Sequence, residues 1–305
     1  MSVALTALNS PIGVKLPTGV ILSPGTEVFY VHNTPSIFRA DLAAETNTSI
    51  LSALNQRDAA RPGAVLVLEG HAESITAATV WSKANTKIIF LGEGDDRGLV
   101  TFTAAASAIT VGAANTRIIN GRFQLEPTTG TVNVASPFIF NSAGCAMTDN
   151  WFGAGTDASN KITIGITTTA GATRFAFERN TVRGAPLATM TTFLRLVGVD
   201  SPRVVGNDII CGTTAAAVGP VQMLTTLSSN VVIAGNVIQN NAASSTACIT
   251  GMANATGWVY DNYLRNMTDT SNAQIALTAA IWSEFSNLGV NNVGERGIAL
   301  GTASV

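Results

Sequence analysis

The residues Met147-Thr148-Asp149-Asn150-Trp151-Phe152 decide the fold, because the same pattern returns along most of the chain. In each copy, apolar residues lead to an Asn or Gly, which is followed by one variable residue and then by another apolar residue. The marks Gly121, Asn150, Asn180, Asn207, Asn236 and Asn262 are 29, 30, 27, 29 and 26 residues apart, with a mean of about 28. An internal period of this length is typical of solenoids and other repeat architectures. The other five copies are Ile118–Phe123, Phe177–Val182, Val204–Ile209, Val232–Ile238 and Val259–Leu264.

A second alternating segment precedes each marked one. Alternation with period 2, together with β-branched residues and turns of small residues, favours strands over helices. A coil of about 28 residues holds roughly three short strands and three turns. We therefore predict an all-β chain that folds as a right-handed parallel β-helix, or solenoid, of about seven coils. The second segments are Ile109–Val111, Phe138–Phe140, Ile162–Ile166, Phe193–Leu196, Val221–Leu224 and Cys248–Thr250.

Stacked coils place equivalent residues in continuous rows about 4.8 Å apart. Apolar residues that point inward form a stacked core, and asparagines in the same turn can bond amide to amide from coil to coil. The predicted inner stack is Phe123, Phe152, Val182, Ile209, Ile238 and Leu264. The predicted structural ladder is Asn150, Asn180, Asn207, Asn236 and Asn262.

The outward residues beside the predicted ladder share no chemistry. Asp149 and Arg179 occupy equivalent sites one coil apart, so we expect them to pair. An exposed pair contributes at most about 1 kcal/mol, and we interpret this one as a mark of register. The outward residues are Arg122, Trp151, Thr181, Asp208, Val237 and Tyr263.

Both ends of the chain differ from its repetitive middle. The first 46 residues place Pro and Gly between single apolar residues, which indicates an extended N-terminal arm. Residues 47–62 are expected to form a capping helix, because a solenoid must cover its open end. The solenoid itself is predicted over residues 63–274. Residues 275–305 keep the alternation but lose the register, so we predict a C-terminal cap there.

The capping helix is predicted from one apolar face and from its end signals. Ile50, Leu51 and Leu54 fall on one side of a helix, and Thr48 or Ser49 can cap its N-terminus. Pro62-Gly63 is the expected stop.

The composition is low in charge and excludes several classes of protein. Only 12% of the residues are charged, against 46% hydrophobic, and the net charge is −2. No basic cluster suited to phosphates occurs, so we expect no nucleic-acid partner. Spanning a membrane takes about 20 consecutive apolar residues, and the chain has no such run, so we expect no membrane partner.

The three cysteines are Cys145, Cys211 and Cys248. They cannot all pair, and no metal-binding spacing connects them. The start of the chain, Met1 to Leu8, lacks the basic residues and the longer apolar core of a signal peptide. We therefore expect reduced, buried cysteines in a protein made in the cytoplasm.

Few acidic residues are placed where they could catalyse a reaction. Glycoside hydrolysis needs two carboxylates about 5 to 10 Å apart, one of them a general acid. No Asp or Glu lies between Asp208 and Asp261. The other acids lie in different phases of the coil, so we predict no catalytic residue and no enzymatic activity. These acids are Glu126, Asp157, Glu178 and Asp200.

No metal or cofactor site is predicted either. The densest acidic stretch, residues 92–98, is interpreted as a Gly-rich solvated turn rather than a calcium site. His71-Ala72-Glu73 matches the H-x-E of zinc deaminases, but their P-C-x-x-C motif is missing. No phosphate-binding loop of the G-x-x-x-x-G-K-[ST] kind occurs.

The aromatic residues do not form a track for a glycan. The four tryptophans are Trp81, Trp151, Trp258 and Trp282. Trp151 and Tyr263 are expected to face outward in one row, but three coils lie between them. Packing against a neighbouring subunit explains such residues at least as well.

The segment from Ser49 to Gly92 resembles a known family. A short helix is followed by Arg61-Pro62-Gly63-Ala64-Val65-Leu66-Val67-Leu68-Glu69-Gly70-His71-Ala72-Glu73, then by Ile88-Ile89-Phe90-Leu91-Gly92 and the degenerate coils. This order is similar to the pectate-lyase-like β-helix proteins of tailed bacteriophages, and within them to virion structural proteins that decorate or cement heads. The likeness covers about residues 49–265.

The resemblance implies a structural virion protein rather than an enzyme. We expect a head decoration or cement protein that binds the major capsid protein as a homo-oligomer, a trimer by analogy, with residues 1–46 as the capsid-contact segment. The alternative is a tailspike or tail-fibre domain that binds, and in some cases cleaves, host polysaccharide. A third reading is a scaffold or adhesin of a bacterium that carries a prophage.

Overall fold

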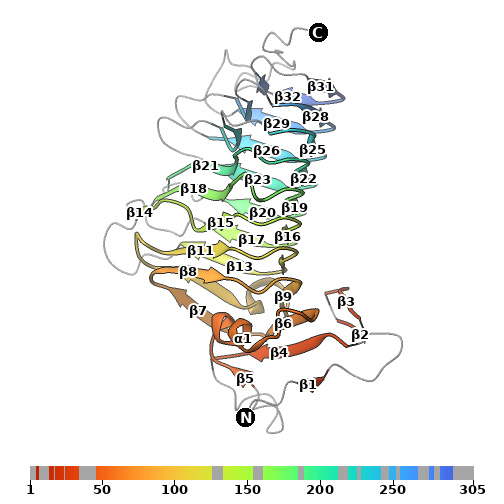
Figure 1. Ribbon diagram of the computed structural model, residues 1–305. Helices are drawn as coiled ribbons and strands as arrows, with labels where there is room; N and C mark the ends of the chain where they lie inside the picture. Colours follow the sequence, from red (N-terminus) through yellow and green to blue (C-terminus); the bar gives the residue numbers. More distant parts are fainter. Residues whose placement is uncertain are drawn as a thin grey trace.

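The repeated segments stack on one another as parallel strands, so the predicted fold class is confirmed (Figure 1). The computed structural model shows an all-β, right-handed parallel solenoid with one α-helix near its N-terminal end. Three sheets form its sides, and a short antiparallel hairpin lies beside them. The structure describes residues 5–6, 14–16, 18–23, 25–33, 46–125, 133–153, 161–184, 189–211, 219–224, 228–241, 247–251, 255–266, 275–277 and 282–290.

Sheet 1 is twelve-stranded and runs from the lowest coil to the highest. Its neighbours pair in parallel, apart from β1, which is antiparallel to β4. Ten of the described strands, β4 to β31, follow one another on a single path. The strands are β1 (Leu5–Thr6), β4 (Glu27–Val31), β5 (Thr46–Asn47), β6 (Gly63–Val67), β9 (Thr86–Phe90), β12 (Arg117–Ile119), β16 (Ala146–Thr148), β19 (Ala176–Glu178), β22 (Arg203–Val205), β25 (Val231–Ala234), β28 (Gly257–Tyr260) and β31 (Trp282–Phe285).

Sheet 2 is nine-stranded and follows sheet 1 across a short turn. In each repeat, the two residues that follow the Asn or Gly mark, such as Trp151 and Phe152 after Asn150, lie in this sheet. The strands are β7 (Ala72–Ile75), β10 (Leu99–Phe102), β13 (Arg122–Leu125), β17 (Trp151–Gly153), β20 (Thr181–Arg183), β23 (Asp208–Cys211), β26 (Val237–Asn240), β29 (Tyr263–Asn266) and β32 (Leu288–Val290).

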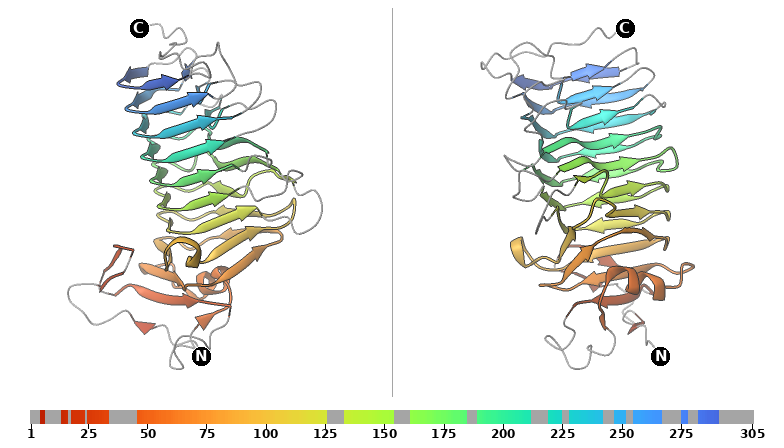
Figure 2. Two further views of the ribbon diagram at one scale, coloured as in Figure 1. Left: turned by 180° about the vertical axis from the view of Figure 1, so that it is seen from behind. Right: turned by 90° about the vertical axis from the view of Figure 1, so that its left-hand side faces the viewer.

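Sheet 3 completes the coil, so the chain passes from sheet 2 to sheet 3, then to sheet 1, and returns to sheet 2 one coil higher (Figure 2). The strands of sheet 3 are β8 (Ala78–Trp81), β11 (Ala108–Val111), β14 (Asn133–Val134), β15 (Phe138–Phe140), β18 (Lys161–Thr168), β21 (Thr189–Leu196), β24 (Val221–Met223), β27 (Ile249–Gly251) and β30 (Ile275–Leu277).

The predicted inner stack lies in sheet 2 with the expected register. Phe123 pairs with Phe152, and the pairing continues through Val182, Ile209, Ile238 and Leu264. All six side chains are buried. Parallel stacking therefore converts the 28-residue period into one continuous apolar column.

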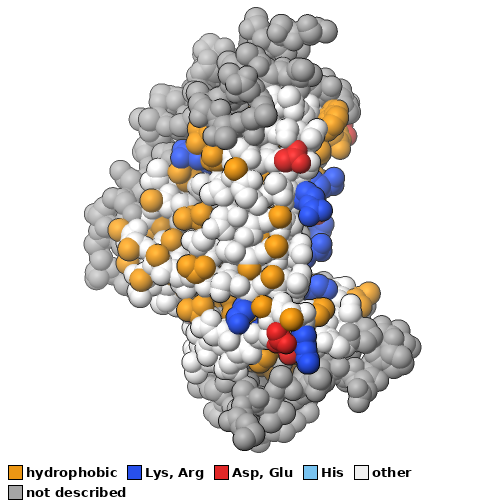
Figure 3. Space-filling view, viewed as in Figure 1, with side chains coloured by type: hydrophobic (Ala, Val, Ile, Leu, Met, Phe, Trp, Pro, Cys, Tyr) orange, Lys and Arg blue, Asp and Glu red, His pale blue; other side chains and the backbone are white. Residues whose placement is uncertain are grey.

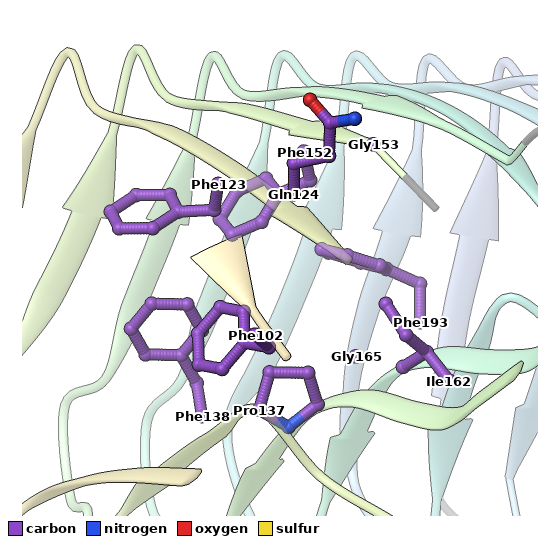
Figure 4. A pocket seen from close by; sticks show the side chains of 10 residues that line it. All are labelled: Phe102, Phe123, Gln124, Pro137, Phe138, Phe152, Gly153, Ile162, Gly165 and Phe193. Atoms are coloured by element: carbon purple, nitrogen blue, oxygen red, sulfur yellow. The ribbon is translucent and has the colours of Figure 1, made fainter. Parts of the chain in front are cut away.

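Phenylalanines fill the lumen in the lower half of the solenoid (Figure 4). The Phe152 ring lies 5.3 Å from the Phe123 ring and 5.1 Å from the Phe193 ring, measured between centroids. The remaining space beside them is about 10 Å³, which is room for roughly one water molecule. The lumen is a packed core and holds no ligand cavity here.

The N-terminal helix α1 spans Ile50–Gln56, and Ser49 caps it by accepting a hydrogen bond from the Ser52 amide. It ends earlier than the predicted stop at Pro62-Gly63, since Arg57 has extended backbone and Gly63 already begins β6. The Arg57 side chain is buried, and its guanidinium donates to the carbonyls of Ala84 and Arg61. Arg57 thus marks the end of the helix and lies buried against the first coils.

The solenoid begins before residue 63, so the predicted boundary of the arm at residue 46 was wrong. Strand β4 lies inside residues 1–46 and pairs with β6 in full parallel register. Above it, β2 (Val14–Lys15) and β3 (Ile21–Leu22) form an antiparallel hairpin. Leu22 packs with Leu66, Ile89 and Ile119 on the outer face of sheet 1. Part of the predicted arm therefore covers apolar residues of its own chain.

The solenoid also continues past residue 274, where the sequence seemed to lose its register. Strands β30, β31 and β32 pair in parallel with β27, β28 and β29. The predicted C-terminal cap thus begins with another coil, and residues 291–305 lie outside the described residues. No helix in the described part of the chain is long and apolar enough to cross a membrane.

Candidate functional site

The five predicted ladder asparagines form one hydrogen-bonded row in the turn between sheets 1 and 2. Each follows a residue in the left-handed backbone region, such as Asp149, Arg179 or Gly206. The side-chain amide of each asparagine donates to the side-chain carbonyl of the next one up, at distances of 2.8 to 3.1 Å. The same carbonyl accepts the lower asparagine's backbone N–H. All five side chains are buried, so the row ties the coils together and offers nothing to a ligand.

Asn287 extends the row by one coil and was missed in the sequence. Its carbonyl accepts the Asn262 side-chain amide at 2.9 Å. The signal was present in Phe285-Ser286-Asn287-Leu288, where Ser286 has the left-handed backbone of the other turns. The step from Asn262 is 25 residues, shorter than the earlier ones.

The row ends downward at Gly121, whose backbone N–H donates to Asn150 Oδ1 at 2.7 Å. A Cβ on Gly121 would lie 2.7 Å from the Phe123 ring and 2.9 Å from the Phe90 ring. An asparagine therefore does not fit here without moving core phenylalanines. The ladder stops where the aromatic core presses against the turn.

One coil below Gly121 the turn between sheets 1 and 2 is expanded. Residues 91–98 separate β9 from β10, and a single 3₁₀ turn, η2 (Gly94–Asp96), lies within them. The expanded turn projects in front of sheet 2 at its lower end (Figure 2, left). Asn120 holds it in place, because its side-chain amide donates to the carbonyls of Phe90 and Gly92 at 2.9 and 3.0 Å.

Arg97 lies at the end of this turn and connects it to the next coils. Its Nε donates to the Gly94 carbonyl at 3.0 Å, and its Nη1 donates to Asn120 Oδ1 at 3.2 Å. Burial lowers the pKa of Arg97, and the nearby positive charge of Arg122 lowers it further. Two guanidinium groups thus lie close together on one side of the turn.

A pocket of about 250 Å³ lies between the expanded turn and sheet 2. Its lining is Gly94, Asp95, Arg97, Arg122 and Trp151. Arg122 Nη1 lies 3.1 Å from Asp95 Oδ1, and the Arg122 guanidinium carbon lies 5.4 Å from the centre of the Trp151 ring. We define these residues as the Arg97–Arg122–Trp151 pocket.

The Trp151 ring lies over Gly153 of its own strand. A Cβ on Gly153 would lie 2.3 Å from Cη2 of the indole, so a glycine is needed for the ring to take this position. Trp151 is half-buried and was predicted to face outward. It is the aromatic part of the pocket.

The predicted exposed pair Asp149–Arg179 is present, with two hydrogen bonds of 2.8 and 2.9 Å. The hydrogen bonds that Arg179 donates to Asp149 raise the pKa of Arg179. Glu178 joins this group by pairing with Arg203 at 3.2 Å. Figure 3 shows Lys and Arg side chains gathered along this edge of the molecule, while hydrophobic side chains are scattered singly.

The acids that were considered for catalysis do not come together in the described residues. Glu178 is paired as above, and Asp200 accepts hydrogen bonds from Ser229 and Asn230 at 2.6 and 3.0 Å. These bonds lower the pKa of Asp200. Glu126 and Asp157 lie outside the described residues.

The two histidines lie near each other at the base of the solenoid. His71 Nε2 lies 3.3 Å from Glu73 Oε2, and the His32 and His71 rings are 6.4 Å apart. Glu73 Oε2 also accepts the Ile50 amide at 2.9 Å, so it links the capping helix to β7. Both histidines are buried in this packing.

The remaining aromatic residues that the structure describes form no continuous track. Trp81 is buried, Trp258 is 44% exposed on sheet 1, and the Trp282 side chain lies outside the described residues. On sheet 2, Val237, Tyr263 and Leu288 are exposed in adjacent coils.

The three cysteines are buried thiols, as expected. Burial raises the pKa of the Cys248 thiol to about 12. Within the described part of the chain, no group of three or more His, Cys, Asp or Glu residues could hold a metal ion.

Comparisons with known proteins add little. No protein-family model matches the chain. No curated protein matches it. A solved structure, ORF18 of Geobacillus virus E2, is similar over 79% of this chain and 57% of that chain, with 9% identity and a TM-score of 0.24. This chain therefore spans less than two thirds of that structure, and a likeness this low says nothing about what the chain does.

Proposed function

We propose that this chain is a structural protein of a tailed-bacteriophage particle, a decoration or cement protein that binds the outer surface of the head. It acts as an oligomer, a trimer by analogy, with the major capsid protein as its partner. It needs no cofactor and catalyses no reaction. It is made in the host cytoplasm and resides in the virion.

The buried asparagine row carries this proposal. It links the coils from Asn150 to Asn287 with side-chain bonds of 2.8 to 3.1 Å, in addition to the strand pairing. In a solenoid each coil contacts only its neighbours, so bonds that pass from coil to coil raise the cost of opening any one of them. Such a column suits a protein whose task is to remain rigid on a particle.

The state of the acidic residues supports a role without catalysis. A general acid in glycoside hydrolysis needs a raised pKa, whereas the pKa of Asp200 is lowered. Asp149, Glu178 and Asp208 each pair with an arginine. Each of these ion pairs joins two neighbouring coils.

The resemblance of residues 49–265 to phage virion proteins supports the particle as the setting. The low charge of the chain supports close packing against a shell, because little charge has to be buried at the contact.

Particles that lack the protein test the proposal. Purified chain is mixed with them, and bound protein is measured by sedimentation. We expect saturable binding at a fixed ratio to the major capsid protein and heads that open at a higher temperature. Binding to host polysaccharide instead of heads, or cleavage of it, would favour the tailspike alternative. A monomer that ignores such particles contradicts the proposal.

A further inference from the structure

We propose that the Arg97–Arg122–Trp151 pocket is a docking site for an acidic side chain, Asp or Glu, of a protein partner. This inference rests on the proposed function, since it supplies the chemistry of the contact with a shell protein. It brings Arg97 of the expanded turn together with two residues of the predicted outward row, Arg122 and Trp151.

The first argument is charge. Arg97 and Arg122 both line the pocket, and the acid that lines it with them is Asp95, whose side chain is 92% exposed. Arg122 by contrast is 24% exposed and is held over the Trp151 ring. An incoming carboxylate can bond the two guanidinium groups in place of the solvated Asp95, and charge-assisted bonds of this kind are the strong ones.

The second argument is the aromatic surface. The Trp151 indole lies over Gly153 and near Arg122 and is half-buried, so an apolar side chain beside the carboxylate can pack on its exposed part. Tryptophan and arginine are enriched in the residues that dominate binding at protein interfaces. The pocket combines both residue types within one coil of each other.

The third argument concerns size and surroundings, which favour a local anchor over a long anionic polymer. The pocket is about 250 Å³ and is bounded below by the expanded turn. Upward along sheet 2 the next outward residues are Thr181 and then Asp208, which already pairs with Arg183. A negatively charged chain that ran up the sheet would meet Asp208, while a single acidic side chain would not.

A titration with blocked peptides tests this site on the whole protein. The four tryptophans are labelled with 5-fluorotryptophan, and the Trp151 signal is assigned with Trp151→Phe. The probes are acetyl-Leu-Glu-Leu-amide and its matched control acetyl-Leu-Gln-Leu-amide. We expect the Glu peptide to shift the Trp151 resonance saturably, and the Gln peptide to bind at least tenfold more weakly.

Variants separate the pocket from general attraction to arginines. Arg122→Gln and Arg97→Gln should each weaken the Glu peptide at least tenfold, while Arg203→Gln, in the pair on sheet 1, should not. The other three fluorine signals report whether each variant is folded. Equal binding of both peptides, or no effect of Arg122→Gln in a folded protein, overturns the proposal.

Two further probes identify other ligands. If inorganic phosphate or glucuronate shifts Trp151 and the Glu peptide does not, the pocket binds a free anion or an acidic sugar and the proposal fails. Particle binding separates this site from the proposed function. Peptide binding without particle binding supports the pocket and removes the head role, whereas particle binding that survives Arg122→Gln removes the pocket as the contact.

Discussion

The turns between sheets 1 and 2 differ sharply between the upper and lower coils. From Asn150 upward the turn is short, and its buried asparagine is tied to those of the neighbouring coils through side-chain amides. At residues 91–98 the same turn is eight residues long and presents Asp95 and Arg97 at the surface. The difference teaches that the ladder turns use their asparagines to join neighbouring coils, whereas the expanded turn below the ladder is long enough to enclose a pocket against sheet 2.

Removing an asparagine from the middle of the row should have the largest effect. Asn207 accepts bonds from the Asn180 backbone and side chain and donates to Phe177 and Asn236. Asn207→Ala leaves several buried polar groups unpaired, each worth about 1 to 3 kcal/mol, so we expect a loss of about 3 kcal/mol or more in the free energy of unfolding. Denaturant unfolding measures it.

Asn230→Gly is the control for this change, because Asn230 has left-handed backbone and glycine keeps it. Asn230 is exposed, and its side chain donates to Asp200 at 3.0 Å. Its replacement should cost no more than about 0.5 kcal/mol. Equal losses in the two variants would show that the buried row contributes no special stability.

Completing the ladder downward should destabilise the protein. Gly121→Asn adds the side chain that the row lacks, but its Cβ would lie within 3 Å of the rings of Phe123 and Phe90. Overpacking of this kind costs about 1 to 3 kcal/mol, and we expect a loss in that range from thermal unfolding. A variant that is more stable than the natural chain would contradict the account of why the ladder ends there.

Alkaline pH should weaken the upper coils through Cys248. Burial raises its pKa to about 12, above the value in the unfolded chain. Its contribution is therefore complete below the unfolded pKa and is lost as the pH rises toward the folded one. Between pH 7 and pH 10, the natural chain should lose about 1.4 kcal/mol more in the free energy of unfolding than Cys248→Ala loses. Unfolding both proteins across this pH range measures the difference. Parallel pH curves for the two proteins would contradict this.

Loosening the expanded turn should have the smallest effect on global stability. Asn120→Gly keeps the left-handed backbone at this position and removes three side-chain hydrogen bonds to the turn. We expect about 1 kcal/mol of global destabilisation and faster hydrogen exchange at residues 92–98, with no change in the ladder coils. Faster exchange throughout the solenoid would show that the two regions are not separate.

The periodic part of the structure could be predicted, because one bonding pattern repeats in the sequence. The inner stack and the asparagines from Asn150 to Asn262 follow from the mark and its spacing. Asn287 was missed because its step is short, and β4 was missed because it lies among prolines and glycines.

The pocket could not be predicted, since it depends on one irregular turn. Residues 92–98 were correctly interpreted as a solvated turn, yet the sequence does not show where that turn folds. The strand register places Arg122 beside Trp151, whereas Arg97 reaches them from the expanded turn, which Asn120 holds. The sequence period predicts the repeated coils, but it gives no information about a turn that is expanded in one coil.

Electron cryomicroscopy of the intact particle tests the central claim most directly. The ten stacked strands of sheet 1 make a column about 43 Å tall at about 4.8 Å per strand. We predict such columns on the outer surface of the head, with the turn at residues 91–98 at the contact with the shell. Columns found only at the tail, or none in the particle, would contradict the claim.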